Sequence, residues 1–212
     1  MRSKLLIAAS LLIGLAAPAL AQAPQGQQPQ TPPAQQQRIR GTIAKLDGRN
    51  LLVKSRDGGT LTIALAPNAT VRALVKKKLS DIHAGDFVGT TSMPGKDGKL
   101  HAVEIHFFPA NLNIPDSQFP WDLEPGSVMT NAHVTGVAKG AQGQVLSVNY
   151  KNGTADVIVD KTTKIVAPAP TQATTADLKP GKAVYIMATK GADGTLTSGN
   201  ITVEKNGVKP PM

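Results

Sequence analysis

The chain has 212 residues, a formal net charge of +9, 3% aromatic residues and no cysteine. The lack of cysteine excludes disulfides, thiolate metal sites and thiol nucleophiles. With 20 glycines and 16 prolines, the composition favours short strands and many turns over a large helical core.

Residues 1–21 have the pattern of a cleavable export signal. Arg2 and Lys4 precede an apolar run, and Ala19-Leu20-Ala21 supplies the small-x-small sequence that signal peptidase cleaves. The apolar run is shorter than the roughly 20 residues of a membrane span. We therefore predict cleavage after Ala21, a periplasmic location and no membrane span in the mature chain.

The rest of the chain divides by composition and repetition. Residues 22–38 are rich in glutamine and proline and have little to bury, which predicts a disordered spacer. Residues 39–107 and 133–205 carry one pattern twice, with residues 108–132 as a connector. Residues 206–212 form a short C-terminal tail.

The duplication is seen in turn residues that match at an offset of 95 or 96 positions. Between the turns, apolar and polar residues alternate, as around Leu61, Ile63 and Leu65, which is the period of a strand. The matches are Gly41 with Gly136, Asp57-Gly58 with Asn152-Gly153, residues 79–82 with 175–178, and Asp97-Gly98 with Asp193-Gly194.

Each copy therefore predicts about five antiparallel strands closed into a small barrel. We expect an all-β protein with two tandem five-stranded barrels of oligonucleotide/oligosaccharide-binding type. In the first copy, Val71, Leu74, Val75, Leu79 and Ile82 fall at helical spacing, which predicts a short amphipathic helix there. The first-copy strands are expected near residues 39–46, 50–55, 60–65, 86–92 and 99–107.

Three features of the first copy form a recognisable set: the Asp57-Gly58 turn, the Leu79-Ser80-Asp81-Ile82 turn with Gly85, and the closing strand from Asp97-Gly98 to Ile105. Together they resemble an uncharacterised small β-barrel domain of exported bacterial proteins, which is often tandem and has no known function. The resemblance implies a fold and no catalytic residues. Proteins of this kind often carry a metal-transporter permease label, and nothing in this sequence fits a permease.

Three residues raise the question of a metal site. His101 and His106 lie five positions apart on one predicted strand, so alternation places them on opposite faces. Glu104 and His106 share a face, which we expect to be solvent-exposed. We predict weak or no metal binding, and a metal-binding accessory function through His101, Glu104 and His106 is the alternative.

Arg72 and Lys76, Lys77 and Lys78 form the densest basic cluster. Such a cluster suits a polyanion, for example an acidic polysaccharide. Few aromatic residues lie in the predicted strands, which argues against specific nucleic-acid binding. We favour a plain solvated surface for this cluster, with polyanion binding as the functional alternative.

The connector combines Phe108, Phe119 and Trp121 with four prolines, three acidic residues and no basic residue. The prolines oppose regular structure, and the aromatic residues argue against disorder. We predict an extended strap packed across both barrels; the alternative is a docking surface for another envelope protein, anchored by Trp121.

No nucleophile elbow, phosphate loop or zinc-hydrolase motif appears in the sequence. The chain is therefore predicted to be a non-enzymatic, monomeric binding or interaction module of the cell envelope, without a cofactor. Its expected partner is an envelope protein or an anionic envelope polymer.

Overall fold

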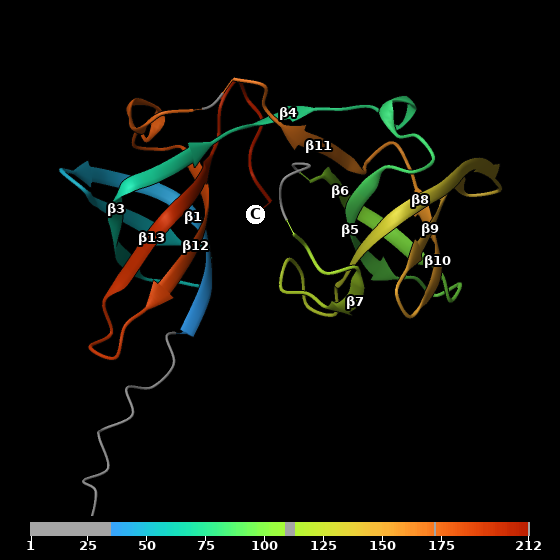
Figure 1. Ribbon diagram of the computed structural model, residues 1–212, viewed down its shortest axis with the longest axis horizontal. Helices are drawn as coiled ribbons and strands as arrows, with labels where there is room; N and C mark the ends of the chain where they lie inside the picture. Colours follow the sequence, from blue (N-terminus) through green and yellow to red (C-terminus); the bar gives the residue numbers. More distant parts are fainter. Residues whose placement is uncertain (1–34, 109–112, 172, 212) are drawn as a thin grey trace, which may run out of the picture. The chain divides into compact units, whose positions relative to one another are not determined.

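The structure, a computed structural model, describes residues 35–108, 113–171 and 173–211. In this part of the chain, strands and two short 3-10 turns make up an all-β fold, as the sequence predicts (Figure 1). The predicted export signal, with its cleavage point after Ala21, and residues 22–34 of the predicted spacer lie outside the described residues.

The first closed barrel, barrel A, has the strand order β1-β12-β13-β3-β2. Neighbouring strands are antiparallel except β13 and β3, which run parallel. Gly58 and Gly59 join β2 to β3 with positive φ angles, the backbone conformation for which glycine is the favoured residue. The strands are β1 (Gln35–Asp47), β2 (Asn50–Ser55), β3 (Thr60–Arg72), β12 (Ala183–Lys190) and β13 (Leu196–Val203).

The second barrel, barrel B, has the order β8-β5-β6-β10-β9, and the parallel pairing of β10 with β6 closes it. Three short strands extend its sheet: β11 (Lys164–Pro168) lies beside β6, β4 (Leu74–Lys76) pairs with β11, and β7 (Ser117–Pro120) pairs with β8. The barrel strands are β5 (Phe87–Pro94), β6 (Leu100–Phe107), β8 (Val128–Gly140), β9 (Gly143–Tyr150) and β10 (Gly153–Val159).

Each barrel contains strands from both repeats. Barrel A takes β1–β3 from the first repeat and β12 and β13 from the second, while barrel B takes β5 and β6 from the first and β8–β10 from the second. The prediction that residues 39–107 and 133–205 each close a barrel of their own is therefore wrong. Because the two copies share one strand pattern, the last two strands of either copy fit the same place, and the chain crosses over at β4 and β11.

The two barrels have the same strand order once the exchange is taken into account. In barrel A, Gly181 N–H donates to the Ile43 carbonyl at 2.9 Å, and in barrel B, Gly85 N–H donates to the Val134 carbonyl at 2.8 Å. Ile43 therefore corresponds to Val134. The sequence match of Gly41 with Gly136 is four residues out of register at this strand, whereas the match of Gly85 with Gly181 is confirmed.

The amphipathic helix predicted between Val71 and Ile82 is absent from the structure. That segment contains the end of β3, then β4, and then the 3-10 turn η1 (Leu79–Asp81). Val75 pairs with Ala167 in β11, so the backbone makes its hydrogen bonds with another strand. An extended chain also covers more distance per residue than a helix, which suits a segment that crosses between barrels.

Three predicted boundaries also change. β1 begins at Gln35, so residues 35–38 belong to a strand and pair with β12, whereas the sequence predicts a spacer there. Strand pairing satisfies the backbone of these residues, so they need no apolar side chains. β8 begins at Val128, inside the predicted connector. In the tail, Val208 is buried and bridges to Lys205.

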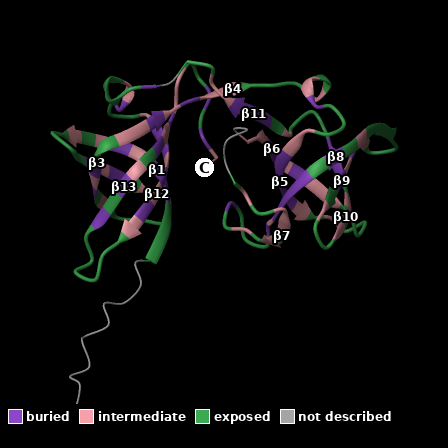
Figure 2. Ribbon diagram, viewed as in Figure 1, coloured by how far each residue is buried: buried purple, intermediate pink, exposed green. Residues whose placement is uncertain are grey.

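The apolar residues that alternate along the strands line two separate cores (Figure 2). Ile63 and Leu65 are buried as their alternation predicts, and Leu61 packs at the edge of the same cluster. The core of barrel A includes Ile39, Ile43, Leu51, Val53, Ile63, Val184, Ile186 and Ile201; that of barrel B includes Val88, Ile105, Ala132, Val134, Leu146, Val148 and Val157.

Candidate functional site

The basic cluster of the sequence is divided in the structure. Arg72 ends β3 in barrel A, where its Nη1 donates to the side-chain oxygen of Asn200 at 2.6 Å. Lys76 ends β4, and Lys77 and Lys78 follow in the stretch that leads to η1 on barrel B. The structure therefore keeps the three lysines together and separates Arg72 from them.

Lys77 and Lys78 line an open groove of about 570 Å³ on barrel B. A third lysine, Lys161, lines it from the turn after β10, and Gln142 and Gln144 line it from the β8–β9 hairpin. The sequence analysis missed these three residues. They are far from Lys77 in the sequence, and only the pairing of strands brings them near it.

The acidic residue of this groove, Asp160, is occupied by its own turn. Its Oδ1 accepts hydrogen bonds from the Thr162 backbone N–H at 2.7 Å and the Thr162 hydroxyl at 2.6 Å. These hydrogen bonds hold the pKa of Asp160 below its ordinary value. The groove thus has three lysines on its lining against one carboxylate, of which Oδ1 is engaged in its own turn.

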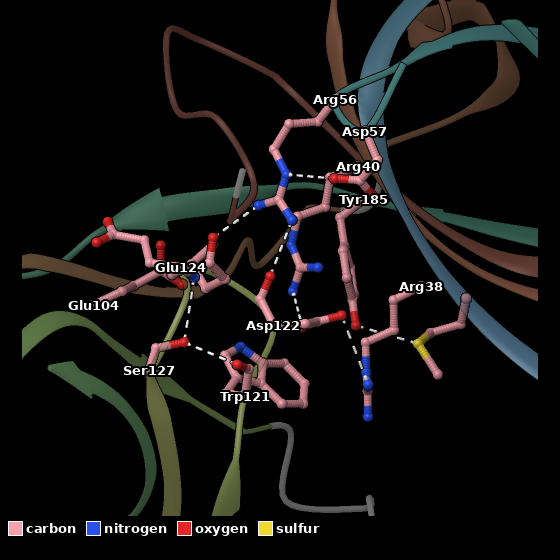
Figure 3. A network of polar contacts seen from close by, with 12 residues as sticks. Arg38, Arg40, Arg56, Asp57, Glu104, Trp121, Asp122, Glu124, Ser127 and Tyr185 are labelled. Carbon is pink, nitrogen blue, oxygen red and sulfur yellow. Dashed lines mark hydrogen bonds and ion pairs between the residues drawn. The ribbon is translucent and has the colours of Figure 1, made fainter. Parts of the chain in front are cut away.

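A second group of polar contacts joins β1 to the connector (Figure 3). The Arg40 side chain is only 2% exposed, and its Nη2 donates to Asp122 Oδ1 at 2.9 Å. Arg56 donates to the backbone carbonyls of Asp122 and Leu123 at 2.9 and 2.8 Å. Burial raises the pKa of Asp122, but the hydrogen bond and charge of Arg40, with Arg38, outweigh it and lower that pKa overall.

Residues 121–127, which we call the clasp, are closed by Ser127. The Trp121 backbone N–H donates to the Ser127 backbone carbonyl at 2.7 Å, and the Ser127 hydroxyl donates to the Trp121 backbone carbonyl at 3.1 Å. The Trp121 ring packs under the Arg38 guanidinium, 4.3 Å from its centroid, and edge-on to Phe119. The clasp contacts barrel A while β7, just before it, pairs with barrel B, which is the arrangement that a strap requires.

The third connector aromatic, Phe108, packs elsewhere. Its ring lies 5.4 Å from Phe87 and 4.6 Å, edge-on, from His106. Gly89 makes this packing possible, because a Cβ there would lie 2.5 Å from the imidazole of His106. All three connector aromatics therefore have packing partners within the chain.

Glu104 and His106 share a face of β6, as predicted, but that face is not exposed to solvent. Glu104 is only 3% exposed, and its Oε1 lies 3.9 Å from His106 Nδ1. Burial raises the pKa of Glu104 to about 7, against the opposing charges of Lys164 and Arg40. Burial also lowers the pKa of His106 to about 4.

His101 lies apart from this pair and contacts Asp97, with its Nε2 at 3.1 Å from Oδ1. The structure therefore brings two of the three suggested metal ligands together and leaves out the third. Among the described residues, no three histidine or acidic side chains gather in a way that would hold a metal ion.

Two further findings bear on function. No helix in residues 35–108, 113–171 and 173–211 is long and apolar enough to cross a membrane. No family model, no curated protein and no solved structure matches this chain. The resemblance to an exported small β-barrel domain therefore stays a prediction.

Proposed function

We propose that this chain is a non-enzymatic binding module of the cell envelope and that it binds an anionic polymer through Lys77, Lys78 and Lys161. The observation that supports the proposal is the groove on barrel B, where these three amines meet one carboxylate already engaged in its own turn.

The lining of the groove fits a polymer that carries both charges and neutral polar groups. The three amines provide a local positive potential, which attracts an anionic chain and is weakened by salt. Gln142 and Gln144 add amides that both donate and accept hydrogen bonds. Leu79, Val159 and Ile165 supply an apolar floor. Carboxylated sugars combine negative charge, hydroxyls and apolar ring faces, so an acidic polysaccharide is the polymer proposed.

We also propose that the protein acts in the periplasm as a monomer after cleavage at Ala21, and that its barrels are of oligonucleotide/oligosaccharide-binding type. The export signal in the sequence and the closed five-stranded barrels support these proposals. Mass spectrometry of periplasmic protein is expected to give an N terminus at Gln22; retention of Met1 would contradict the location.

The binding proposal is tested with polygalacturonate of defined length as the probe, titrated calorimetrically at low and moderate salt. The triple variant Lys77→Gln, Lys78→Gln and Lys161→Gln is expected to lose affinity by about tenfold, because three exposed charge contacts contribute about 0.5 kcal/mol each. The salt dependence is expected to become shallower.

A matched control keeps the change in net charge the same. The variant Lys54→Gln, Lys96→Gln and Lys190→Gln removes three exposed lysines outside the groove and is expected to bind nearly as well as the wild type. Equal losses in both variants would reduce the binding to non-specific attraction by net charge. No binding by the wild type would contradict the proposal.

A further inference from the structure

The interiors of the two barrels differ at one corresponding pair of positions. In barrel A, Ile39 on β1 lies opposite Ile186 on β12, and both are buried. In barrel B, the corresponding strands place Thr130 on β8 opposite Thr90 on β5, and both are 0% exposed. Barrel B therefore has two hydroxyls where barrel A has an apolar pair.

A third buried hydroxyl follows on the same strand. Ser92 in barrel B takes the place of Ala188 in barrel A, and both are buried. In the described part of the chain, neither the Thr90 Oγ1 nor the Ser92 Oγ meets a hydrogen-bond partner. Burying a hydroxyl without a partner is unfavourable, so repeated use of hydroxyls at core positions needs an explanation.

Strand β7 supplies a hydrogen-bond partner for one of the three hydroxyls, that of Thr130. Gln118 on β7 reaches Thr130, and its Nε2 donates to the Thr130 Oγ1 at 3.0 Å. Gln118 is also exposed and lines a second open groove, of about 470 Å³. The amide thus links one of the buried hydroxyls, that of Thr130, to a surface that solvent can reach, whereas Thr90 and Ser92 have no such contact among the described residues.

The lining of this groove is amphipathic and balanced in charge. Lys99 and Asp156 carry opposite charges, and Asp156 also accepts a hydrogen bond from the Ser147 hydroxyl at 2.6 Å. Thr154 contributes a hydroxyl and Tyr150 an aromatic ring, and the remaining lining includes Leu100, Val145 and Ile158. In barrel A, the pairing of β2 with β3 places Ser55 and Thr62 where Tyr150 and Asp156 stand, so neither the ring nor the carboxylate is repeated there.

From these observations, we propose that the groove beside Gln118 binds a neutral sugar residue. A sugar hydroxyl both donates and accepts, as do the Gln118 amide and the Thr154 hydroxyl. The Tyr150 ring and the aliphatic side chains suit the apolar face of a pyranose ring. The balanced charges of Lys99 and Asp156 favour a neutral ligand over an anionic one. The site shares no residue with the lysine groove, so the inference stands apart from the proposed function.

The test uses the full chain and two neutral probes, methyl glucopyranoside and N-acetylglucosamine, observed by saturation-transfer NMR. The wild type is expected to saturate the ring protons of at least one probe. Gln118→Leu removes a hydrogen-bonding amide and Tyr150→Leu removes an aromatic packing face. Each is expected to weaken binding by about tenfold, which corresponds to about 1–2 kcal/mol of binding free energy.

Two controls separate a binding role from a structural one. Thr62→Val changes the position in barrel A that corresponds to Asp156 and is expected to leave probe binding unchanged. The double variant Thr90→Val and Thr130→Val keeps the side-chain shape and tests whether the buried hydroxyls support the site. It is expected to fold and to bind the probes more weakly than the wild type.

Three results would overturn the proposal. The first is no saturation of either probe by the wild type, and the second is equal saturation in wild type, Gln118→Leu and Tyr150→Leu. The third is a double threonine variant that binds the probes as the wild type does, which would mean that the hydrogen bond from Gln118 to Thr130 does not position the amide for the ligand.

Discussion

The buried Glu104 and its partly buried neighbour His106 predict an unusual dependence of stability on pH. Burial raises the pKa of Glu104 from 4.5 to about 7, so between these pH values the unfolded chain releases a proton that the folded protein keeps. The free energy of unfolding therefore falls as pH rises through this window. The fall amounts to about 3 kcal/mol, because each pH unit between the unfolded and folded pKa values contributes about 1.4 kcal/mol.

His106 has the opposite effect. Burial lowers its pKa from 6.5 to about 4, so between these values the unfolded chain binds a proton that the folded protein does not. The free energy of unfolding therefore falls, again by about 3 kcal/mol, as pH is lowered through this window. The two slopes oppose each other between pH 4.5 and 6.5, and the contributions of the pair nearly cancel in the wild type.

Single substitutions remove one slope and expose the other. At pH 8, Glu104→Gln is expected to have a free energy of unfolding up to about 3 kcal/mol higher than that of the wild type. At pH 4, where Glu104 is protonated in both states, the two free energies are expected to be equal. For His106→Gln, the difference in the free energy of unfolding from the wild type is expected to be more favourable to the variant at pH 4 than at pH 8. Lys164 and Arg40 are the cations that act on Glu104, and both remain in these variants.

Urea unfolding across pH 4–8 measures these differences. The double variant Glu104→Gln and His106→Gln is the control, and between pH 4.5 and 6.5 its profile is expected to parallel that of wild type. A difference between Glu104→Gln and wild type that does not change with pH would refute the reasoning, because it would mean that Glu104 titrates alike in both states.

Two further predictions concern packing and charge. Asp122→Asn is expected to lower the free energy of unfolding by about 2 kcal/mol in thermal or urea unfolding, because it leaves the buried Arg40 charge without its carboxylate. The control Asp47→Asn, in an exposed ion pair, is expected to have no measurable effect. Equal effects of the two variants would contradict the role of the clasp. Gly89→Ala is expected to lower the free energy of unfolding by about 1–3 kcal/mol, because the new Cβ would lie 2.5 Å from His106 and 2.7 Å from Phe108. The control Gly136→Ala, whose Cβ would meet no atom within 4 Å, is expected to change it by less than about 0.5 kcal/mol. Urea unfolding of both variants checks this, and a silent Gly89→Ala would contradict the packing described.

The local structure of the strands could be predicted from the sequence, whereas their partners could not. The expected strand at residues 50–55 is observed with the same bounds, and the glycine turns lie where the hairpins need them. These features depend on neighbours in the sequence. Which copy supplies the last two strands of a barrel depends on contacts between residues about 140 positions apart, such as Gly41 and Val184. Two copies with the same pattern leave that choice open.

The candidate sites show the same division. Lys77 and Lys78 could be found because they are adjacent in the sequence, but Lys161 reaches the same groove only through the fold. The shared face of Glu104 and His106 followed from strand alternation. Their burial did not, because it depends on segments distant in the sequence that pack against that face of β6.

The acidic connector shows that a charge pattern can indicate a partner within the chain. Its three acidic residues stand out in a basic protein, and Asp122 meets Arg38 and Arg40 of β1. The sequence could not indicate that one of these arginines is buried, because alternation along β1 identifies a face but not what covers it.

The exchange of strands between the repeats is tested most directly by an engineered disulfide, since the chain has no cysteine of its own. Gln36 on β1 lies opposite Thr189 on β12, and opposed residues of antiparallel strands have Cα atoms about 4.5–5.5 Å apart, within the range of a disulfide. If each repeat closed its own barrel, Gln36 would instead lie opposite Met93, the residue of the first repeat that matches Thr189.

The measurement compares two double variants after mild oxidation, by peptide mapping of the monomeric fraction. Gln36→Cys with Thr189→Cys is expected to form the disulfide, and Gln36→Cys with Met93→Cys is expected to remain reduced. A disulfide between positions 36 and 93, with none between 36 and 189, would contradict the exchanged barrels.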